Sequence, residues 1–129
     1  MEPTPPNRMP DDVLIVEDDP IIALGFEDTI LSFGVKTVRR AGGVARALHM
    51  IAERAPDFAL LDVGLVRENS FAVAERLEAL NIRFVFVTGY GAEVRLPHAF
   101  ADRPRLTKPC SSDALQALLA GRAVDGAAR

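Results

Sequence analysis

Acidic residues, a hydroxyl and a lysine follow short apolar runs at widely separated places in the chain. Glu17 and Asp18 come directly after one run, Asp62 follows a second, Thr88 a third, and Lys108 a shorter fourth. Carboxylates crowded at one point repel one another unless a cation joins them, and Mg²⁺ prefers carboxylates together with water and phosphate oxygens. A hydroxyl and an ammonium suit the oxygens of a phosphoryl group. These residue types predict a Mg²⁺-dependent site at which a carboxylate can form an aspartyl phosphate.

The apolar runs that precede these residues, together with one further run, predict the strands of a parallel sheet. Most of them are continuously apolar, which is typical of strands that are buried on both faces. One run is interrupted by Lys36 and Thr37, so we expect that strand to lie nearer the edge of the sheet. The expected strands are 13–16, 35–38, 58–61, 84–87 and a weak fifth at 105–107.

Helical patterns lie between the expected strands. Asp19 followed by Pro20 is typical of a helix start, and Ser70 and then Ser111 or Ser112 could cap two later helices. Apolar residues at helical spacing predict which side chains face the core. These are Ile22, Phe26, Ile30 and Phe33 in the first helix; Val44, Leu48, Ile51, Ala52 and Ala55 in the second; Val73, Leu77 and Leu80 in the third; and Leu115, Leu118 and Leu119 in the last.

This alternation of strands and helices predicts the fold class. Right-handed crossovers would give a parallel sheet with helices on both faces. Five such units in 129 residues indicate an α/β protein with the flavodoxin-like doubly wound fold, a five-stranded parallel sheet of order 2-1-3-4-5. The pattern is poor at 91–102, where we expect a short or irregular helix. Ligand sites of such sheets lie beyond the carboxyl ends of the strands, where the acidic residues, the hydroxyl and the lysine would meet.

Composition excludes several classes of protein. A net charge of −3 provides no basic field for nucleic-acid phosphates, and a single cysteine, Cys110, excludes an intrachain disulfide. No segment approaches the roughly 20 apolar residues of a membrane span, and no apolar leader is present, so we expect a cytoplasmic protein without a membrane span. We expect residues 1–11 to be a disordered, proline-rich lead, 12–120 to be the folded domain and 121–129 to be a frayed tail.

Four short motifs carry a resemblance to a known family. They are VLIVEDDP at 13–20, ALLDVGL at 59–65, VTGYG at 87–91 and TKPC at 107–110. In this order they resemble the response-regulator receiver domain (CheY-like) of two-component phosphorelays, over about residues 12–119. The segment Phe86–Gly91 further resembles the FAT GUY subgroup of receivers, many of which are stand-alone proteins.

The resemblance implies a metal site built around the phosphoacceptor. Asp62 would accept the phosphoryl group and bind Mg²⁺. Asp18 would bind the cation directly, Glu17 would help through water, and Gly64 would contribute its backbone carbonyl.

The resemblance also implies switch residues near the phosphoryl group. Thr88 would bind a phosphoryl oxygen after activation, and Lys108 would pair with the phosphoryl group or with Asp62. The Lys108–Pro109 bond would be cis. Tyr90 would either pack against the switch or remain an exposed loop aromatic, and the sequence favours neither.

Departures from the family's pattern concern the output rather than the chemistry. Arg105 stands at the usual aromatic switch position, Val66 where many receivers have proline, and Asn69-Ser70 where many have Asp-Gly. These residues leave the phosphorylation chemistry intact, but they do not support the usual threonine–aromatic output mechanism.

The implied function is that of a single-domain response regulator. It would accept a phosphoryl group from a sensor histidine kinase or a phosphotransfer protein, and would catalyse only its own phosphorylation and dephosphorylation. It would signal to an unknown downstream protein through the face around Thr88 and Lys108 with the last helix, or act as a phosphate sink. One alternative is a degenerate receiver that binds its partner without phosphorylation. The other is a small Mg²⁺-dependent phosphatase of the haloacid dehalogenase type, which is disfavoured because its two aspartates would fall at Glu17 and Asp19.

Overall fold

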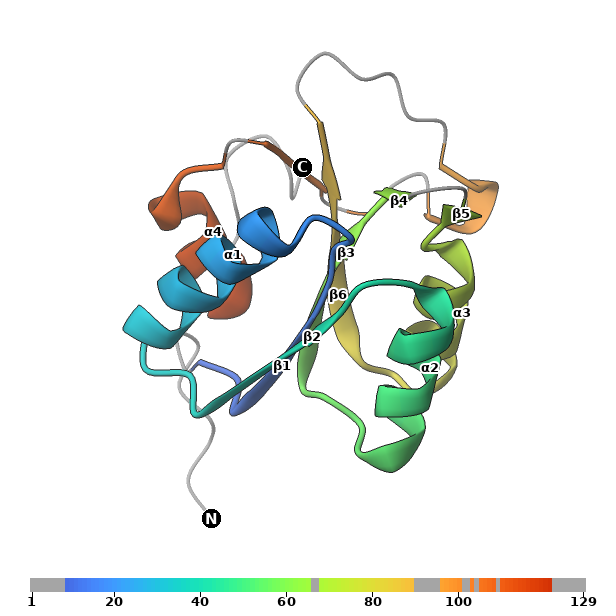
Figure 1. Ribbon diagram of the computed structural model, residues 1–129, viewed down its shortest axis with the longest axis horizontal. Coiled ribbons are helices and arrows are strands. Elements are labelled where there is room, and N and C mark those ends of the chain that lie inside the picture. Colours follow the sequence, from blue (N-terminus) through green and yellow to red (C-terminus); the bar gives the residue numbers. More distant parts are fainter. Residues whose placement is uncertain are drawn as a thin grey trace.

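The computed structural model describes residues 9–65, 68–89, 96–100, 103, 105–108 and 110–121. A five-stranded parallel sheet runs through its centre, in the order β2 (Thr37–Ala41), β1 (Asp12–Val16), β3 (Phe58–Asp62), β6 (Arg83–Thr88) and β7 (Arg105–Thr107). Helices α1 (Pro20–Ser32) and α4 (Ser112–Leu119) cover one face, and α2 (Val44–Glu53) and α3 (Phe71–Ala79) cover the other (Figure 1). Counted in chain order among themselves, these five strands have the order 2-1-3-4-5. This arrangement confirms the expected α/β fold.

The sheet is buried on both faces, as the apolar runs predict. Alternate residues of a strand point to opposite faces, and β6 shows this directly. Phe84 and Phe86 pack in a cluster with buried residues of α2 and α3, whereas Val85 and Val87 pack with those of α1 and α4. β2 is only half-buried at the edge of the sheet, which confirms the expectation for the interrupted run.

β2 begins two residues later than expected and includes two arginines. Arg39 donates from Nε and from a terminal nitrogen to the Asp12 carboxylate, at 3.1 and 3.0 Å. Arg54 donates to the same carboxylate at 2.9 Å. An edge strand leaves its side chains room to reach a partner, and the ion pairs therefore allow charged residues within β2. The apolar pattern alone does not include these residues and places the strand too early.

α1 begins where the sequence indicates and ends shortly before a glycine. The Asp19 carboxylate accepts hydrogen bonds from the backbone N–H groups of Ile21 and Ile22 at 2.9 and 3.3 Å, and Pro20 is the first helical residue. Beyond the last turn Gly34 has φ +97°, a conformation that glycine adopts without the steric cost of a Cβ. These caps fix the helix directly after the acidic residues that end β1.

Some expectations for the helices are wrong. Ile22 is exposed, and the buried residues of α1 are Ala23 and Ile30. Ala52 and Ala55 are exposed, and the buried residues of α2, which ends at Glu53, are Ala47 and Ile51. Leu80, which follows α3, is also exposed. The described part of the poorly patterned stretch contains one 3₁₀ turn, η1 (His98–Phe100), in agreement with the short, irregular element expected there.

The two serine caps differ. The Ser111 hydroxyl accepts a hydrogen bond from the Ala114 N–H at 3.1 Å, as predicted. The Ser70 hydroxyl makes no cap hydrogen bond; instead the side-chain oxygen of Asn69 accepts from the Phe71 N–H at 3.0 Å. None of the helices in the described part of the chain is long and apolar enough to cross a membrane.

Candidate functional site

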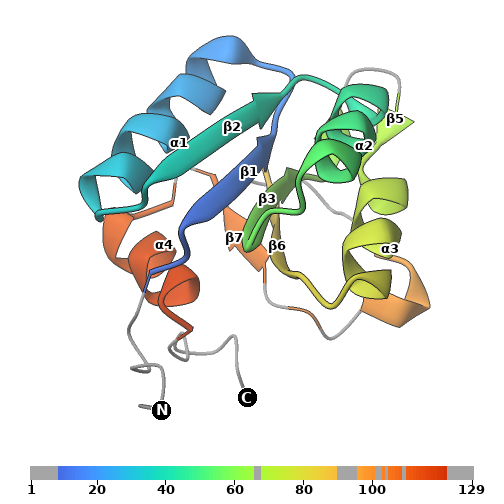
Figure 2. The same cartoon turned by 90° about the horizontal axis from the view of Figure 1, so that it is seen from below.

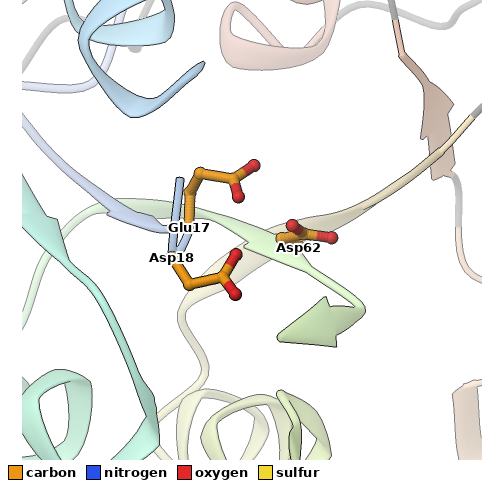
Figure 3. A group of neighbouring side chains, drawn as sticks. All are labelled: Glu17, Asp18 and Asp62. Atoms are coloured by element: carbon orange, nitrogen blue, oxygen red, sulfur yellow. The ribbon is translucent and has the colours of Figure 1, made fainter. Parts of the chain in front are cut away.

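Glu17 and Asp62 leave adjacent strands at the same edge of the sheet. Val16 is aligned with Leu61 in the β1–β3 pair. Glu17 follows Val16 and Asp62 follows Leu61, so these two acidic residues lie side by side. One carboxylate oxygen from each of Glu17, Asp18 and Asp62 lies within 4.8 Å of the other two. Figure 3 shows the three side chains gathered at the ends of β1 and β3. The acidic cluster that the sequence predicts is therefore formed.

Lys108 reaches this acidic cluster (Glu17, Asp18 and Asp62) from the end of β7. Its Nζ lies 2.8 Å from Glu17 Oε1 and 3.1 Å from Asp62 Oδ2. Its backbone N–H donates to the Thr88 carbonyl at 2.7 Å, which fixes the base of the side chain. The sequence predicts the contact with Asp62 but not the one with Glu17. Because two buried carboxylates share one ammonium, this pair keeps an excess of negative charge.

The crowding of charged groups shifts the pKa values of both Glu17 and Lys108. Burial raises the pKa of Glu17 to about 7, with the hydrogen bond from Lys108 opposing the rise and the neighbouring Asp62 adding to it. Burial alone would lower the pKa of Lys108, but its hydrogen bonds to Glu17 and Asp62 outweigh burial and raise that pKa above its ordinary value. The site therefore favours the binding of positive charge, either a proton or a cation.

The raised pKa of Glu17 predicts how stability depends on pH in the absence of divalent cations. A carboxyl whose pKa is raised on folding from 4.5 to about 7 contributes stability that is complete below the lower value and is lost as the pH rises through the upper one. Between about pH 5 and about pH 8.5, the wild type should lose about 1–2 kcal/mol of unfolding free energy relative to E17Q. Urea unfolding in EDTA, followed by circular dichroism at both pH values, measures this difference.

The change with pH, rather than the absolute stability of the variant, carries this test. Gln keeps an oxygen that can accept from Lys108 but loses the carboxylate oxygen that accepts from the Asp19 N–H at 3.1 Å, a loss that does not depend on pH. A difference between the two proteins that is the same at both pH values would contradict the assignment.

The segment after Asp62 folds back as an antiparallel pair of short strands, β4 (Gly64–Leu65) and β5 (Glu68–Asn69). The Gly64 N–H donates to Asp62 Oδ1 at 3.2 Å, and Gly64 is aligned with Asn69. The structure therefore places Gly64 beside Asp62, and the ligand role that the resemblance implies for its carbonyl stays a prediction.

Thr88 ends β6 at the same edge of the sheet, aligned with Thr107 of β7. Its hydroxyl is buried and donates to the Leu106 carbonyl at 3.5 Å. The hydroxyl thus bonds the backbone of β7 rather than a carboxylate of the acidic cluster. Tyr90 and Pro109, to which the sequence assigns a possible switch role and a cis bond, lie outside the described residues.

The donor set of the acidic cluster fits a hard divalent cation. Mg²⁺ takes oxygen ligands and commonly uses one or two carboxylates, completing its coordination with water and phosphate oxygens. Here three carboxylates converge, and the two that Lys108 contacts are not neutralised by its single charge. A carboxylate held beside an ammonium and a divalent cation has the surroundings of a nucleophile for phosphoryl transfer.

Comparison with known proteins identifies the family. Residues 13–120 match the sequence profile of the response regulator receiver domain. The chain belongs to this family. Receivers are signalling modules rather than conventional enzymes, and the match spans both the sheet and the acidic cluster described above.

Solved structures and one curated relative are similar to this receiver. The solution structure of SdrG from Sphingomonas melonis Fr1 is 41% identical, covers 84% of this chain and 93% of its own, and has a TM-score of 0.73. The BeF3-activated conformation of SdrG from Pseudomonas melonis Fr1 is 38% identical, with coverages of 86% and 94% and a TM-score of 0.71. A Pseudomonas aeruginosa protein, named as a candidate transcriptional regulator, is 34% identical over 70 residues, which are 54% of this chain. The matched part of this chain spans only about a third of that relative's length (34%).

Proposed function

We propose that this receiver accepts a phosphoryl group on Asp62 from a phosphohistidine of a sensor histidine kinase or a phosphotransfer protein. The observation that carries the proposal is the position of the Asp62 carboxylate, 3.1 Å from the Lys108 ammonium and within 4.8 Å of oxygens of Glu17 and Asp18. Membership of the receiver family supports the same chemistry, as does the similarity to SdrG, which has been solved in a BeF3-activated conformation.

The transfer exchanges one bond to phosphorus for another. An oxygen of the Asp62 carboxylate attacks the phosphorus, a P–O bond forms, and the P–N bond of the donor breaks. The electron pair of the broken bond goes to the imidazole nitrogen, which takes up a proton from water. Attack of water on the phosphorus later releases inorganic phosphate and restores the carboxylate, so nothing is oxidised or reduced.

Four residues of the site would hold Mg²⁺: Asp18 and Asp62 through their carboxylates, Gly64 through its carbonyl, and Glu17 through water. When bound, Mg²⁺ would offset the negative charge of the carboxylates and of the phosphoryl oxygens. Lys108 places its ammonium where charge builds up on the transferring group, and its contact with Glu17 holds it there before the donor arrives.

The phosphorylated state would act through the residues at the ends of β6 and β7. Phosphorylation adds about two negative charges beside Lys108. Thr88 would turn its hydroxyl from the Leu106 carbonyl to a phosphoryl oxygen and so reorder the loops after Asp62 and Thr88. Signalling would follow by contact of this face, which includes α4 and Tyr90, with a downstream protein, or the receiver would drain phosphate from a kinase.

Two finer assignments belong to the same proposal. The sequence Phe86–Gly91 supports membership of the FAT GUY subgroup. Arg105, at the usual aromatic switch position, is exposed, which supports an output that does not use an aromatic there. Because the donor would be a phosphohistidine protein of two-component signalling, we place the reaction in the cytoplasm.

Phosphorylation by a small donor with a P–N bond tests the proposal directly. Incubation with phosphoramidate and Mg²⁺ should add the mass of one phosphoryl group to the intact protein. Chelation of Mg²⁺ with EDTA should slow this addition by at least about a hundredfold, because the uncompensated carboxylates would repel the phosphoryl oxygens. Intact-mass spectrometry over time gives both rates.

A second receiver of known activity, incubated in the same tube, serves as the control. If that receiver gains the phosphoryl group and this chain does not, the chain is not a phosphoacceptor under these conditions, and the degenerate-receiver alternative is favoured. An equal rate with and without Mg²⁺ would contradict the proposed role of the acidic cluster.

A further inference from the structure

The first turn of α2 takes its cap from a distant part of the chain. Gly43, at the N-cap position, has no side chain with which to accept a hydrogen bond. The N–H of Val44 instead donates to Oε2 of Glu68, on β5, at 3.0 Å. Figure 2 shows β5 beside the start of α2. A carboxylate is favoured at this end of a helix, where N–H groups are unpaired and the helix dipole is positive.

This cap is connected to Asp62 by a short series of contacts. Glu68 is aligned with Leu65 across the β4–β5 pair, and Leu65 is buried in the core. The next aligned pair is Gly64 with Asn69, and the Gly64 N–H donates to Asp62 Oδ1 at 3.2 Å. A pair of strands this short is marginal by itself, so contacts outside the pair must fix its position.

Glu68 contacts the corner between β2 and α2, and this corner also contacts Glu17 at the end of β1. The carbonyl of Ala41, two residues before Gly43, accepts a hydrogen bond from the Glu17 N–H at 3.0 Å. The corner between β2 and α2 therefore contacts the end of β1 through Ala41 and the segment after Asp62 through Glu68. β1 and β3 are already paired in the sheet, and Glu68 adds a second connection, outside the sheet, between the end of β1 and the segment that follows β3.

We propose that Glu68 is a positioning residue for the phosphoacceptor site. By capping α2 it holds β4 and β5 in place, and it thereby fixes the backbone of Gly64 against Asp62 and the cation. This inference rests on the proposed function. It adds a residue outside the acidic cluster whose effect on cation binding passes through Gly64.

Gly43 offers a second, independent way to disturb the cap. A Cβ at this position would lie 3.0 Å from Glu68 Oε2, which is tighter than nine in ten Cβ contacts, and no other atom is comparably close. The φ of Gly43 is −168°, an extended backbone that alanine adopts without strain. G43A should therefore displace the flexible carboxylate of Glu68 while leaving the backbone undisturbed.

Titration of each protein with Mg²⁺, followed by the amide NMR signal of Gly64, tests the proposal. E68A should weaken Mg²⁺ binding about tenfold, which is at the lower end of the range for residues that support metal ligands indirectly. It should also shift the Gly64 signal in the metal-free protein. E68Q keeps an oxygen acceptor for the Val44 N–H and should bind within about twofold of wild type. E75A removes an exposed glutamate from α3 and serves as the matched control.

A double-mutant cycle separates positioning from a general loss of stability. G43A should weaken Mg²⁺ binding in the wild type but change it little further in E68A, because the carboxylate it displaces is already absent. Wild-type affinity in E68A, or equal weakening in E75A, would overturn the proposal. No phosphodonor is used, so failure of phosphorylation would not affect this result. If the wild type bound no Mg²⁺, the cation site would be wrong, and the metal-free Gly64 signal would still decide the role of Glu68.

Discussion

Replacing Asp62 by asparagine should abolish acceptance of the phosphoryl group, with a rate at least about a thousandfold below wild type. The amide is nearly the same size as the carboxylate but is a poor nucleophile, since it lacks the negative charge that attacks phosphorus. Intact-mass spectrometry with phosphoramidate and Mg²⁺ measures the loss. Transfer of radiolabel from a phosphorylated histidine kinase gives a second measurement with the proposed class of donor.

The loss in D62N should be chemical rather than structural. Asp62 is buried beside Glu17, so removing its charge relieves repulsion, and the variant should unfold at no lower urea concentration than wild type in EDTA. Asp28→Asn provides the matched control, because Asp28 is an exposed residue of α1 and its replacement should leave phosphorylation unchanged.

The chemistry of the product identifies the residue that carries it. An aspartyl phosphate is an acyl phosphate, and hydroxylamine should release it while leaving a phosphate ester on serine or threonine intact. Phosphate that is retained in D62N, or that survives hydroxylamine in wild type, would exclude Asp62 as the acceptor. Thr88, whose buried hydroxyl also lies at this edge of the sheet, would then be the first residue to examine.

The meeting of distant site residues could be predicted because it follows from the sheet itself. The carboxyl ends of parallel strands meet at one edge, so residues that follow apolar runs must come together there. Glu17, Asp62 and Lys108 do so in the structure. The partner choice of Lys108 could not be predicted in the same way, because its contact with Glu17 depends on the directions of two long side chains rather than on strand position.

Contacts between remote charged side chains account for the error at β2. Apolar periodicity places this strand from residue 35, whereas the structure begins it at Thr37 and includes two arginines. Arg39 is satisfied by Asp12, 27 residues away, and such a pair leaves no local signal in the sequence. Burial of an ion pair of this kind can be recognised only once the order and register of β1 and β2 are known.

The sequence does show that the start of α2 lacks an ordinary side-chain cap. Most helices begin with a residue whose side chain accepts a hydrogen bond from the first turn. Two glycines, Gly42 and Gly43, precede α2, so neither of these residues has a side chain that can accept this hydrogen bond. That the acceptor is Glu68 could not be predicted, because the alignment of β4 with β5 and its position beside α2 arise from tertiary packing.

Replacing Phe86 by alanine should lower the free energy of unfolding by about 3–5 kcal/mol, the cost of removing a fully buried aromatic side chain and leaving a cavity. Phe86 is completely buried on β6. Its ring lies edge-on to three others, with centroid distances of 5.5 Å to Phe84, 5.7 Å to Phe100 and 5.9 Å to Phe71. Urea unfolding followed by circular dichroism measures the change. F86L, which fills most of the volume, should cost less than about 1.5 kcal/mol.

The position of Phe86 explains why this substitution should spare the chemistry of the protein that remains folded. The ring supports Phe71 at the start of α3 and Phe100 in η1, and its contacts therefore hold the elements that flank the site rather than the acidic cluster. Phosphorylation by phosphoramidate, corrected for the folded fraction, should stay within about threefold of wild type. Leu31→Ala, at an exposed position of α1, should change stability by no more than about 0.5 kcal/mol. A similarly small effect of F86A would mean that the aromatic cluster does not anchor these elements.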